Sequence, residues 1–345
     1  MSERIAALRA RLEEPLLVSS LVNVRYLTGL ASSNAALLVE PDRVRLFTDF
    51  RYAERARAVA GVEFVETRRD LYAELATLLS GRIGFDSRAL SHDRYLLLGG
   101  AGIDLAPRPG LVEALRAVKD DGELDAIRRA AALTSEAFTL LAEEPFVGLS
   151  ERDVAWRMES LLHEVGGDGS AFDVIVASGP SGGSPHAVPG ERRIGAGETV
   201  VVDAGCRLDG YCSDCTRTFL TGALPDELQR AYEVVEQAQA TGVAAVRSGA
   251  DSAAVDRTAR DVVEQAGLGD RFGHGLGHGL GLEVHEAPYL NTEWPSVLAA
   301  GNVVTVEPGV YLPGLGGVRI EDLVVVTDGA AEVLTSVTRE PVIVG

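Results

Sequence analysis

The stretch covering residues 199–219 constrains the fold of this chain more than any other. Two runs rich in β-branched and aromatic residues flank the segment Arg207–Gly210, a pattern typical of a β-hairpin. Each run carries an aspartate, Asp203 before the turn and Asp214 after it. Because side chains alternate along a strand, a loop with an even number of residues points both carboxylates to the same face.

The length of the loop decides how close these two carboxylates lie. A two-residue loop at Asp209-Gly210 pairs Leu208 with Tyr211. In that register Asp203 lies opposite Thr216, and Asp214 is its diagonal neighbour. A four-residue loop puts the two aspartates directly opposite each other. Two such acids repel unless a positive charge lies between them. The hairpin alone leaves two interpretations open, a solvated pair of acids near a turn or a site for a hard cation.

The composition is that of an ordinary globular protein, with 46% hydrophobic and 24% charged residues among 345. This length allows one large or two medium domains. A formal net charge of -19 argues against nucleic acid and anionic membranes as partners. No apolar run approaches the ~18 residues that indicate a membrane span. Residues 1–14 are amphipathic and lack the apolar core of a signal peptide. We therefore expect a cytoplasmic protein.

All cysteines of the chain, Cys206, Cys212 and Cys215, fall within the hairpin. An odd number of cysteines without an export signal predicts reduced thiols. Cys212 and Cys215 have the CxxC spacing of zinc and redox sites. Residues three apart on a strand, however, face opposite sides. We therefore do not expect the two sulfurs to share a metal.

The first third of the chain alternates strand and helix patterns, which predicts an α/β domain over residues 1–112. Short apolar or alternating runs bounded by turn residues predict the strands, and two longer segments of about ten residues predict the helices. The expected strands cover residues 16–19, 22–27, 35–39, 43–48 and 82–85, and the expected helices cover residues 51–60 and 70–79.

A second, larger domain is predicted over residues 113–345, after a boundary marked by the proline- and glycine-containing segment 107–110. Ser150 has the position of an N-cap, and Asp153 approximates a capping box. Two helices, strands and the hairpin are followed by two further helices and strands, which suggests two similar halves. The expected helices cover residues 121–143, the segment after Ser150, 225–248 and 252–265.

Histidines gather in glycine-rich segments. His274, His278 and His285 lie within twelve residues, and five glycines between positions 273 and 281 disfavour a helix there. In an extended chain His274 and His278 share a face, whereas His285 joins them only through a bend or bulge, which glycine permits. A further histidine, His186, ends the glycine-rich loop 179–185. This pattern favours a functional site over structural histidines.

Two glutamates are embedded in apolar strands. Glu307 follows the run Val303–Val306, and Glu321 lies within a second apolar strand expected over residues 317–326, on the same face as Arg319. A buried carboxylate must be paired, hydrogen-bonded or metal-bound. Glu321 is therefore either a partner of Arg319 or a metal ligand.

The combination of these residues is more specific than its parts. Asp203, Asp214, His278, Glu307 and Glu321 offer four carboxylates and one imidazole, and the four negative charges balance two divalent cations. This is the set of ligands expected for a two-metal hydrolytic site, in which metals ~3.5–4 Å apart hold and activate a water.

The sequence resembles the pita-bread metallopeptidases, which comprise prolidase, aminopeptidase P and methionine aminopeptidase, with creatinase as a relative that uses no metal. The resemblance covers essentially the whole chain and is strongest for the proline-specific branch. It implies an α+β protein, with a C-terminal pita-bread fold of pseudo-two-fold halves after a smaller α/β creatinase-type domain. The segments that carry it are Asp203–Gly205, Tyr211–Thr218, His274–Glu286, Glu307–Gly309 and Gly317–Asp322.

The resemblance also implies the role of each metal ligand. Asp203 would chelate one metal, whereas His278 and Glu307 would hold the other. Asp214 and Glu321 would bridge both. The ions implied are two per chain, with Mn²⁺ preferred, although these ligand types also accept Co²⁺, Zn²⁺ and Fe²⁺.

The same resemblance places His186, His274, His285 and Arg319 around the substrate. It implies that Glu307 transfers a proton, that His285 stabilises the oxyanion, and that His186 also belongs to the catalytic set. His186 and His274 would lie on the departing side and help form a proline pocket.

The implied function is that of a two-metal exopeptidase, which hydrolyses the bond between an N-terminal residue and a following proline. Short peptides with proline second are then the substrates, and a homodimer is expected. Two alternatives stay open, a methionine aminopeptidase-like enzyme and a non-catalytic binding protein that retains the fold. The N-terminal domain and Arg319 weigh against the first, and the intact ligand set weighs against the second. The sequence does not decide between a dipeptidase and an aminopeptidase for longer peptides.

Overall fold

The computed structural model describes residues 3–345, which divide into two compact units, one ending at Arg116 and one from Ala117 to Gly345. None of the helices in the described residues is long and apolar enough to cross a membrane. The elements of the first unit are α1 (Glu3–Arg9), β1 (Leu16–Val18), α2 (Leu21–Thr28), β2 (Ala35–Val39), β3 (Val44–Asp49), α3 (Ala53–Arg57), β4 (Glu63–Thr67), α4 (Leu71–Leu78), β5 (Arg82–Phe85), α5 (His92–Gly100), β6 (Asp104–Pro107) and α6 (Glu113–Arg116).

The first unit is built on a six-stranded mixed sheet in the order β4-β3-β2-β1-β5-β6. β1 pairs antiparallel with β2 and parallel with β5, and the outer pairs β3–β4 and β5–β6 are parallel. Apolar residues of the sheet pack against α4 and α5 in one core, which includes Phe47, Leu75 and Leu98. This arrangement is the α/β domain that the first third of the sequence predicts.

One predicted strand of this unit is wrong. Residues 22–27 form the middle of helix α2 and not a strand. Ser20 is its N-cap, where the side chain accepts a hydrogen bond from the N–H of Asn23, and Gly29 ends the helix with a φ of 75°. The run Val22–Leu27 alternates apolar and polar residues as far as Tyr26, which also fits a strand. The two caps therefore decide its structure.

The second unit holds four long helices and four small sheets. Its elements are α7 (Asp121–Leu141), α8 (Glu151–Glu164), β7 (Gly169–Ser170), β8 (Ile175–Ser178), the 3₁₀ helix η1 (Gly179–Gly183), β9 (Thr199–Ala204), β10 (Cys206–Leu208), β11 (Tyr211–Cys212), β12 (Cys215–Leu220), α9 (Asp226–Ala245), α10 (Ser252–Gln265), the 3₁₀ helix η2 (Gly269–Arg271), β13 (Gly277–Gly279), β14 (Glu286–Leu290), β15 (Val303–Val306), β16 (Gly309–Leu312), β17 (Gly316–Arg319), β18 (Asp322–Val325) and β19 (Glu332–Val333).

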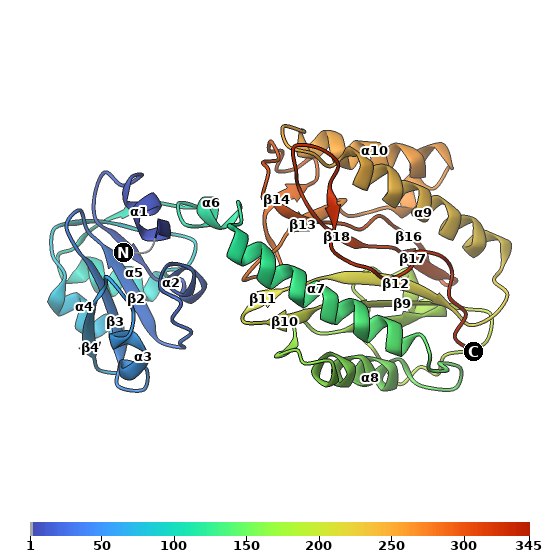
Figure 1. The fold of residues 1–345 in the computed structure, drawn as a ribbon, viewed down its shortest axis with the longest axis horizontal. Helices are drawn as coiled ribbons and strands as arrows, with labels where there is room; N and C mark the ends of the chain where they lie inside the picture. Colours follow the sequence, from blue (N-terminus) through green and yellow to red (C-terminus); the bar gives the residue numbers. More distant parts are fainter. Residues whose placement is uncertain (1–2) are drawn as a thin grey trace. The chain divides into compact units, whose positions relative to one another are not determined.

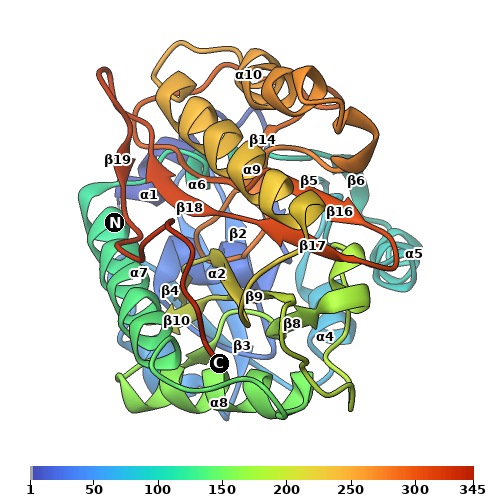
Figure 2. The same ribbon diagram turned by 90° about the vertical axis from the view of Figure 1, so that its right-hand side faces the viewer.

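The two halves of this unit repeat the same plan. Helices α7 and α8 pack on β8, β9 and β12, and helices α9 and α10 pack on β15 to β18. In both views the strands lie between these two helix pairs (Figures 1 and 2). The capping box at the start of α8 is confirmed, because Ser150 and Asp153 exchange side chain–backbone hydrogen bonds. The repeated order expected from the sequence is thus present.

The hairpin has the register of a two-residue loop. Leu208 pairs with Tyr211 between β10 and β11, and Asp203 pairs with Thr216 in the same register between β9 and β12, in a second sheet. The φ angles of Asp209 and Gly210 are 52° and 85°, as a type I′ turn requires. The alternative four-residue loop is therefore wrong.

The cysteines of the hairpin are free and buried. Cys212 packs in a core with α7, whereas Cys215 packs in the core beneath α7 and α8 that also contains Cys206. Among the described residues, no candidate metal cluster includes a cysteine. The two cysteines of the CxxC pattern thus lie in different cores.

We predict that Gly210→Ala destabilises the second unit by about 1–2 kcal/mol, because an L side chain at a φ of 85° is strained. Gly329→Ala is the matched control, since Gly329 is exposed and its φ is outside the left-handed range. Both tryptophans, Trp156 and Trp294, lie in the second unit, so their fluorescence during urea unfolding reports on this unit. Equal shifts in the two variants would contradict the assigned turn.

Candidate metal centre

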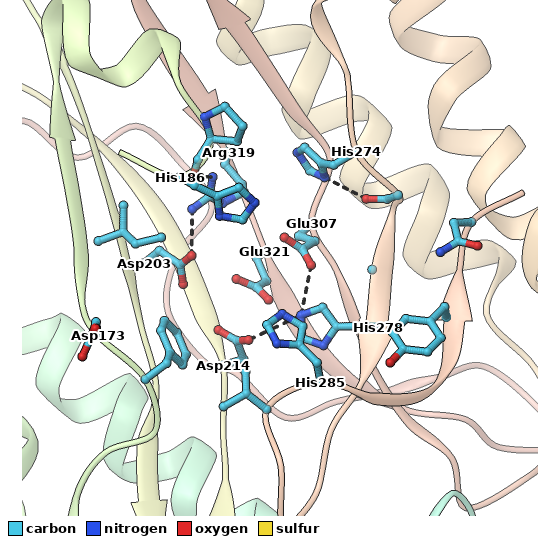
Figure 3. A pocket seen from close by; sticks show the side chains of 18 residues that line it. Asp173, His186, Asp203, Asp214, His274, His278, His285, Glu307, Arg319 and Glu321 are labelled. Carbon is cyan, nitrogen blue, oxygen red and sulfur yellow. Dashed lines mark hydrogen bonds and ion pairs between the residues drawn. The ribbon is translucent and has the colours of Figure 1, made fainter. Parts of the chain in front are cut away.

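A cavity of about 430 Å³ lies in the second unit, and all nine residues that the sequence predicts for the site line it. They arrive from strands of both halves and point toward one another (Figure 3). The five predicted metal ligands are Asp203, Asp214, His278, Glu307 and Glu321, and the four predicted substrate residues are His186, His274, His285 and Arg319. The structure therefore brings together residues that lie up to 135 positions apart, from 186 to 321.

Two strands and the ends or breaks of three others position the five predicted ligands. Asp203 is in β9 and His278 is in β13. Asp214 lies between β11 and β12, Glu307 directly follows β15, and Glu321 lies between β17 and β18. At such positions the neighbouring backbone stays paired in sheets while the side chain turns into the cavity. The apolar runs that suggested these acids thus also hold them in place.

His278 faces the carboxylates through one ring nitrogen. Its Nε2 lies 3.3 Å from Oε1 of Glu307 and 3.7 Å from Oδ2 of Asp214. Its Nδ1 lies 3.1 Å from the carbonyl oxygen of Gly279, which can only accept a hydrogen bond. Nδ1 therefore carries a proton, and Nε2 is the nitrogen that can ligate a metal. One atom from each of Asp214, His278 and Glu321 lies within 4.8 Å of the others.

Three carboxylate oxygens in this cluster are buried without a hydrogen-bond partner, namely Oδ1 of Asp203, Oδ1 of Asp214 and Oε1 of Glu321. A buried acceptor without a donor costs about 1–3 kcal/mol, and more when it is charged. Oxygen ligands of this kind, with one imidazole, suit a divalent cation. The residues present thus fit a metal centre.

The electrostatics of the cluster favour the same conclusion. Burial and the neighbouring carboxylate of Glu321 raise the pKa of Asp214 well above its usual value. Burial, together with the charges of Glu307 and Asp203, likewise raises the pKa of Glu321. Burial alone would raise the pKa of Glu307, but the hydrogen bond and charge of His278 lower it to about 2. Without a cation, the cluster therefore resists carrying all of its negative charges at once.

Arg319 is bound to Asp203 and not to Glu321. Its Nη2 donates to Oδ2 of Asp203 over 2.7 Å, and the side chain is almost fully buried. The alternative in which Glu321 merely pairs with Arg319 is thus wrong. The run 317–326 is broken into β17 and β18, and this break could not be predicted from an unbroken apolar pattern.

Arg319 also connects Asp203 to His274 through Tyr311. Nη1 of Arg319 donates to the hydroxyl of Tyr311, which lies 2.9 Å from Nε2 of His274. Nδ1 of His274 lies 2.8 Å from the carbonyl oxygen of Gly275 and carries the proton, so Nε2 accepts from Tyr311. Burial lowers the pKa of His274, which keeps the ring neutral.

Three functional neighbours were missed in the sequence. Thr216 donates to Oε2 of Glu321 over 2.7 Å, and Thr305 donates to Oε1 of Glu307 while accepting from the N–H of His278. Tyr311 is the third. Both threonines lie two residues from a predicted ligand, so alternation along the strand could have indicated them. Nothing in the sequence pattern indicated Tyr311.

His285 and His186 lie at the mouth of the cavity, where both are exposed. The ring of His285 is 4.2 Å from the ring of His278, centroid to centroid. A register shift after His278 in the β13–β14 pair provides the irregularity that His285 needs to reach this face. Burial and the neighbouring His278 lower the pKa of His285.

Comparison with known proteins agrees with this geometry. The model of metallopeptidase family M24 matches residues 125–328, and that of the creatinase/prolidase N-terminal domain matches residues 4–118. The Xaa-Pro dipeptidase of Pyrococcus furiosus is 33% identical over 352 residues, which cover 99% of each chain.

Two solved structures extend this similarity to the fold. The Xaa-Pro dipeptidase from Bacillus anthracis superposes with a TM-score of 0.95 at 36% identity, over 99% of both chains. The X-Pro aminopeptidase from Thermotoga maritima superposes with a TM-score of 0.88 at 30% identity, over 96% of this chain and 97% of its own.

The fold and the site together define a metallopeptidase with a pita-bread catalytic domain and a creatinase-type N-terminal domain. The chain belongs to metallopeptidase family M24.

We predict that divalent cation binding releases protons and strengthens as the pH rises. The pKa values of Asp214 and Glu321 are raised, so these groups hold protons that a cation must displace. Calorimetric titration with Mn²⁺ in two buffers of different ionisation enthalpy measures the release. In Asp214→Asn, which cannot give up a proton at this position, we expect the release to fall and affinity to drop ~10-fold or more. Proton uptake, or unchanged binding in the variant, would contradict the site.

Proposed function

We propose that this protein is an Xaa-Pro exopeptidase that uses two divalent cations per chain. The observation that carries the proposal is the meeting of four carboxylates and His278 in one pocket, with three buried carboxylate oxygens lacking partners. The pocket also contains three further histidines and Arg319, which the proline-specific branch of the family uses around its substrate. The relatives that share the full length of the chain are named Xaa-Pro dipeptidases and X-Pro aminopeptidases.

The five ligands divide between the two proposed cation positions. Asp203 would hold one cation and His278 with Glu307 would hold the other, whereas Asp214 and Glu321 would contribute to both positions. Mn²⁺ is the proposed ion, although the ligand types also accept Co²⁺, Zn²⁺ and Fe²⁺. When bound, such a pair supplies Lewis acidity and lowers the pKa of a coordinated water toward neutrality.

The side chains around this centre handle protons and orientation. Glu307 accepts a proton from the attacking water and passes it toward the departing nitrogen. Thr305 orients its Oε1 through a hydrogen bond of 3.1 Å. The pKa of His285 is lowered, so its ring is neutral, and it donates a hydrogen bond to the developing oxyanion. His186 is also assigned to the catalytic set.

The remaining residues bind the substrate. His186 and His274 border the position of the proline ring, and Arg319 lies close enough to Asp203 and Tyr311 to hold the acidic side of the pocket in place. The free N-terminal amine of the peptide lies near the cations, on the side of Asp203 and Asp214. A pocket that holds the amine in this way is specific for peptides with a free N-terminus.

We predict that peptides with proline second are hydrolysed at least ~10-fold faster than their alanine-second analogues, about 1.4 kcal/mol in transition-state binding. Proline has no N–H, so an ordinary residue in its place brings a donor without a partner. The assay compares kcat/KM for Ala-Pro-Gly, Ala-Ala-Gly and Met-Ala-Gly with Mn²⁺ present, and is repeated with Co²⁺, Zn²⁺ and Fe²⁺.

Each alternative gives a different result in this assay. Preferred cleavage of Met-Ala-Gly would move the function to a methionine aminopeptidase. No cleavage of any peptide with any of the four metals would favour a non-catalytic binding protein.

A homodimer and a cytoplasmic location are further parts of the proposal. Closed two-fold dimers are the commonest soluble oligomers, and the family resemblance implies one here. For a homodimer, we expect light scattering to give twice the chain mass of 36.4 kDa. A monomer at every concentration that supports activity would contradict the dimer and leave the peptidase proposal standing.

A further inference from the structure

The pocket is electrostatically divided. Asp203 and Asp214 lie on one side of it and His274 on the other, with Asp173 beyond the two acids (Figure 3). In the proposed function, the N-terminal amine of the peptide lies on the side of Asp203 and Asp214, near the cations that they would hold. The remainder of a bound peptide therefore extends toward the side of His274.

The far side of the pocket lacks a positive charge for a carboxylate. Of the described residues that line it, Arg319 is the one arginine, and none is a lysine. Its guanidinium already donates to Asp203, to Tyr311 and to the carbonyl oxygen of Pro185. Of the two histidines that border the proline ring, His274 uses both ring nitrogens in hydrogen bonds, whereas His186 is exposed and is not a permanent cation. A carboxylate placed here would be desolvated without a counter-ion, which is costly.

A free dipeptide would place its carboxylate in this part of the pocket. In Ala-Pro the carboxylate carbon is two bonds from the proline nitrogen, so it must enter with the ring. In a longer peptide the same position holds a neutral amide, and the terminal carboxylate lies farther out.

The rim beyond this side of the pocket is aromatic. Tyr289 pairs with His278 across the β13–β14 ladder and lines the pocket. The ring of Trp294 packs against Tyr289, with centroids 5.5 Å apart, and is 61% exposed. An exposed tryptophan beside a pocket is typical of a binding surface.

The loop of Trp294 is ordered by Asn291, another residue that lines the pocket. Oδ1 of Asn291 accepts hydrogen bonds from the N–H groups of Glu293 and Trp294. The segment 291–297 carries one charged residue, Glu293, which is acidic. This rim therefore offers apolar surface and no attraction for a carboxylate.

We propose that the site takes peptides of three or more residues in preference to dipeptides, and that Tyr289 and Trp294 form a shelf that binds the residue after proline. The inference rests on the proposed function and specifies its substrate class. The shelf continues directly from the pocket wall through the pair His278–Tyr289. Apolar side chains after proline are the ones that it favours.

The first test separates charge from length. It compares kcat/KM for Ala-Pro, its neutral amide Ala-Pro-NH₂, Ala-Pro-Gly and Ala-Pro-Leu-Gly, each with the Mn²⁺-loaded enzyme. We expect the amide and the longer peptides to exceed Ala-Pro by ~5-fold or more. Cleavage of Ala-Pro as fast as its amide would overturn the inference but support an Xaa-Pro peptidase. If no proline peptide were cleaved, the proposed function itself would fail.

The second test concerns the shelf and has a matched control. Trp156 on α8 is 60% exposed, almost as much as Trp294, but does not line the pocket. In Trp294→Ala, we expect kcat/KM for Ala-Pro-Leu-Gly to fall ~3-fold or more relative to that for Ala-Pro-NH₂, mainly through KM. Trp156→Ala should leave this ratio unchanged. An unchanged ratio in Trp294→Ala, or loss of the dimer in light scattering, would overturn the shelf.

A readout other than activity completes the test. Trp156→Phe leaves Trp294 as the single tryptophan of the chain. We expect its fluorescence to change on binding of a reduced-amide analogue of Ala-Pro-Leu-Gly, which cannot be hydrolysed, and not on binding of the analogue of Ala-Pro. The same response to both analogues would contradict contact with the residue after proline.

Discussion

Repulsion among buried carboxylates is the constraint on which the rest of the catalytic unit depends. Asp203, Asp214, Glu307 and Glu321 share one pocket, and burial with mutual repulsion raises the pKa of Asp214 and Glu321. A fold keeps such groups together only if surrounding interactions offset their cost. Here the offset comes from His278, from Arg319 and, as proposed, from divalent cations.

Apolar strands hold the carboxylates of the pocket close to one another. The two larger cores of the unit consist of apolar strands packed on helix pairs, and the acids lie where these strands end or break. Close approach of strands is also required at Gly277, where a Cβ would come within 2.0 Å of the carbonyl oxygen of Thr305. Because β13 can lie so near β15, His278 reaches both Thr305 and Glu307. The glycines of this segment thus serve the geometry of the site.

Much of the site could be predicted from the sequence, because it depends on local pattern. The Asp209-Gly210 turn determines the register of Asp203, and strand alternation directs side chains to one face. The rest depends on contacts that no local pattern records. The break between β17 and β18 and the pairing of Arg319 with Asp203 are of this kind. In the first unit, residues expected to form a strand belong to helix α2. Its caps, Ser20 and Gly29, could have been recognised in the sequence.

Anomalous scattering from crystals grown with Mn²⁺ is the most direct test of whether the pocket holds two divalent cations. We expect two anomalous peaks in the second unit of each chain, one beside Asp203 and one beside His278 and Glu307. Both peaks should contact Asp214 and Glu321. A pocket without peaks, or Mn²⁺ bound only outside it, would contradict a two-cation site.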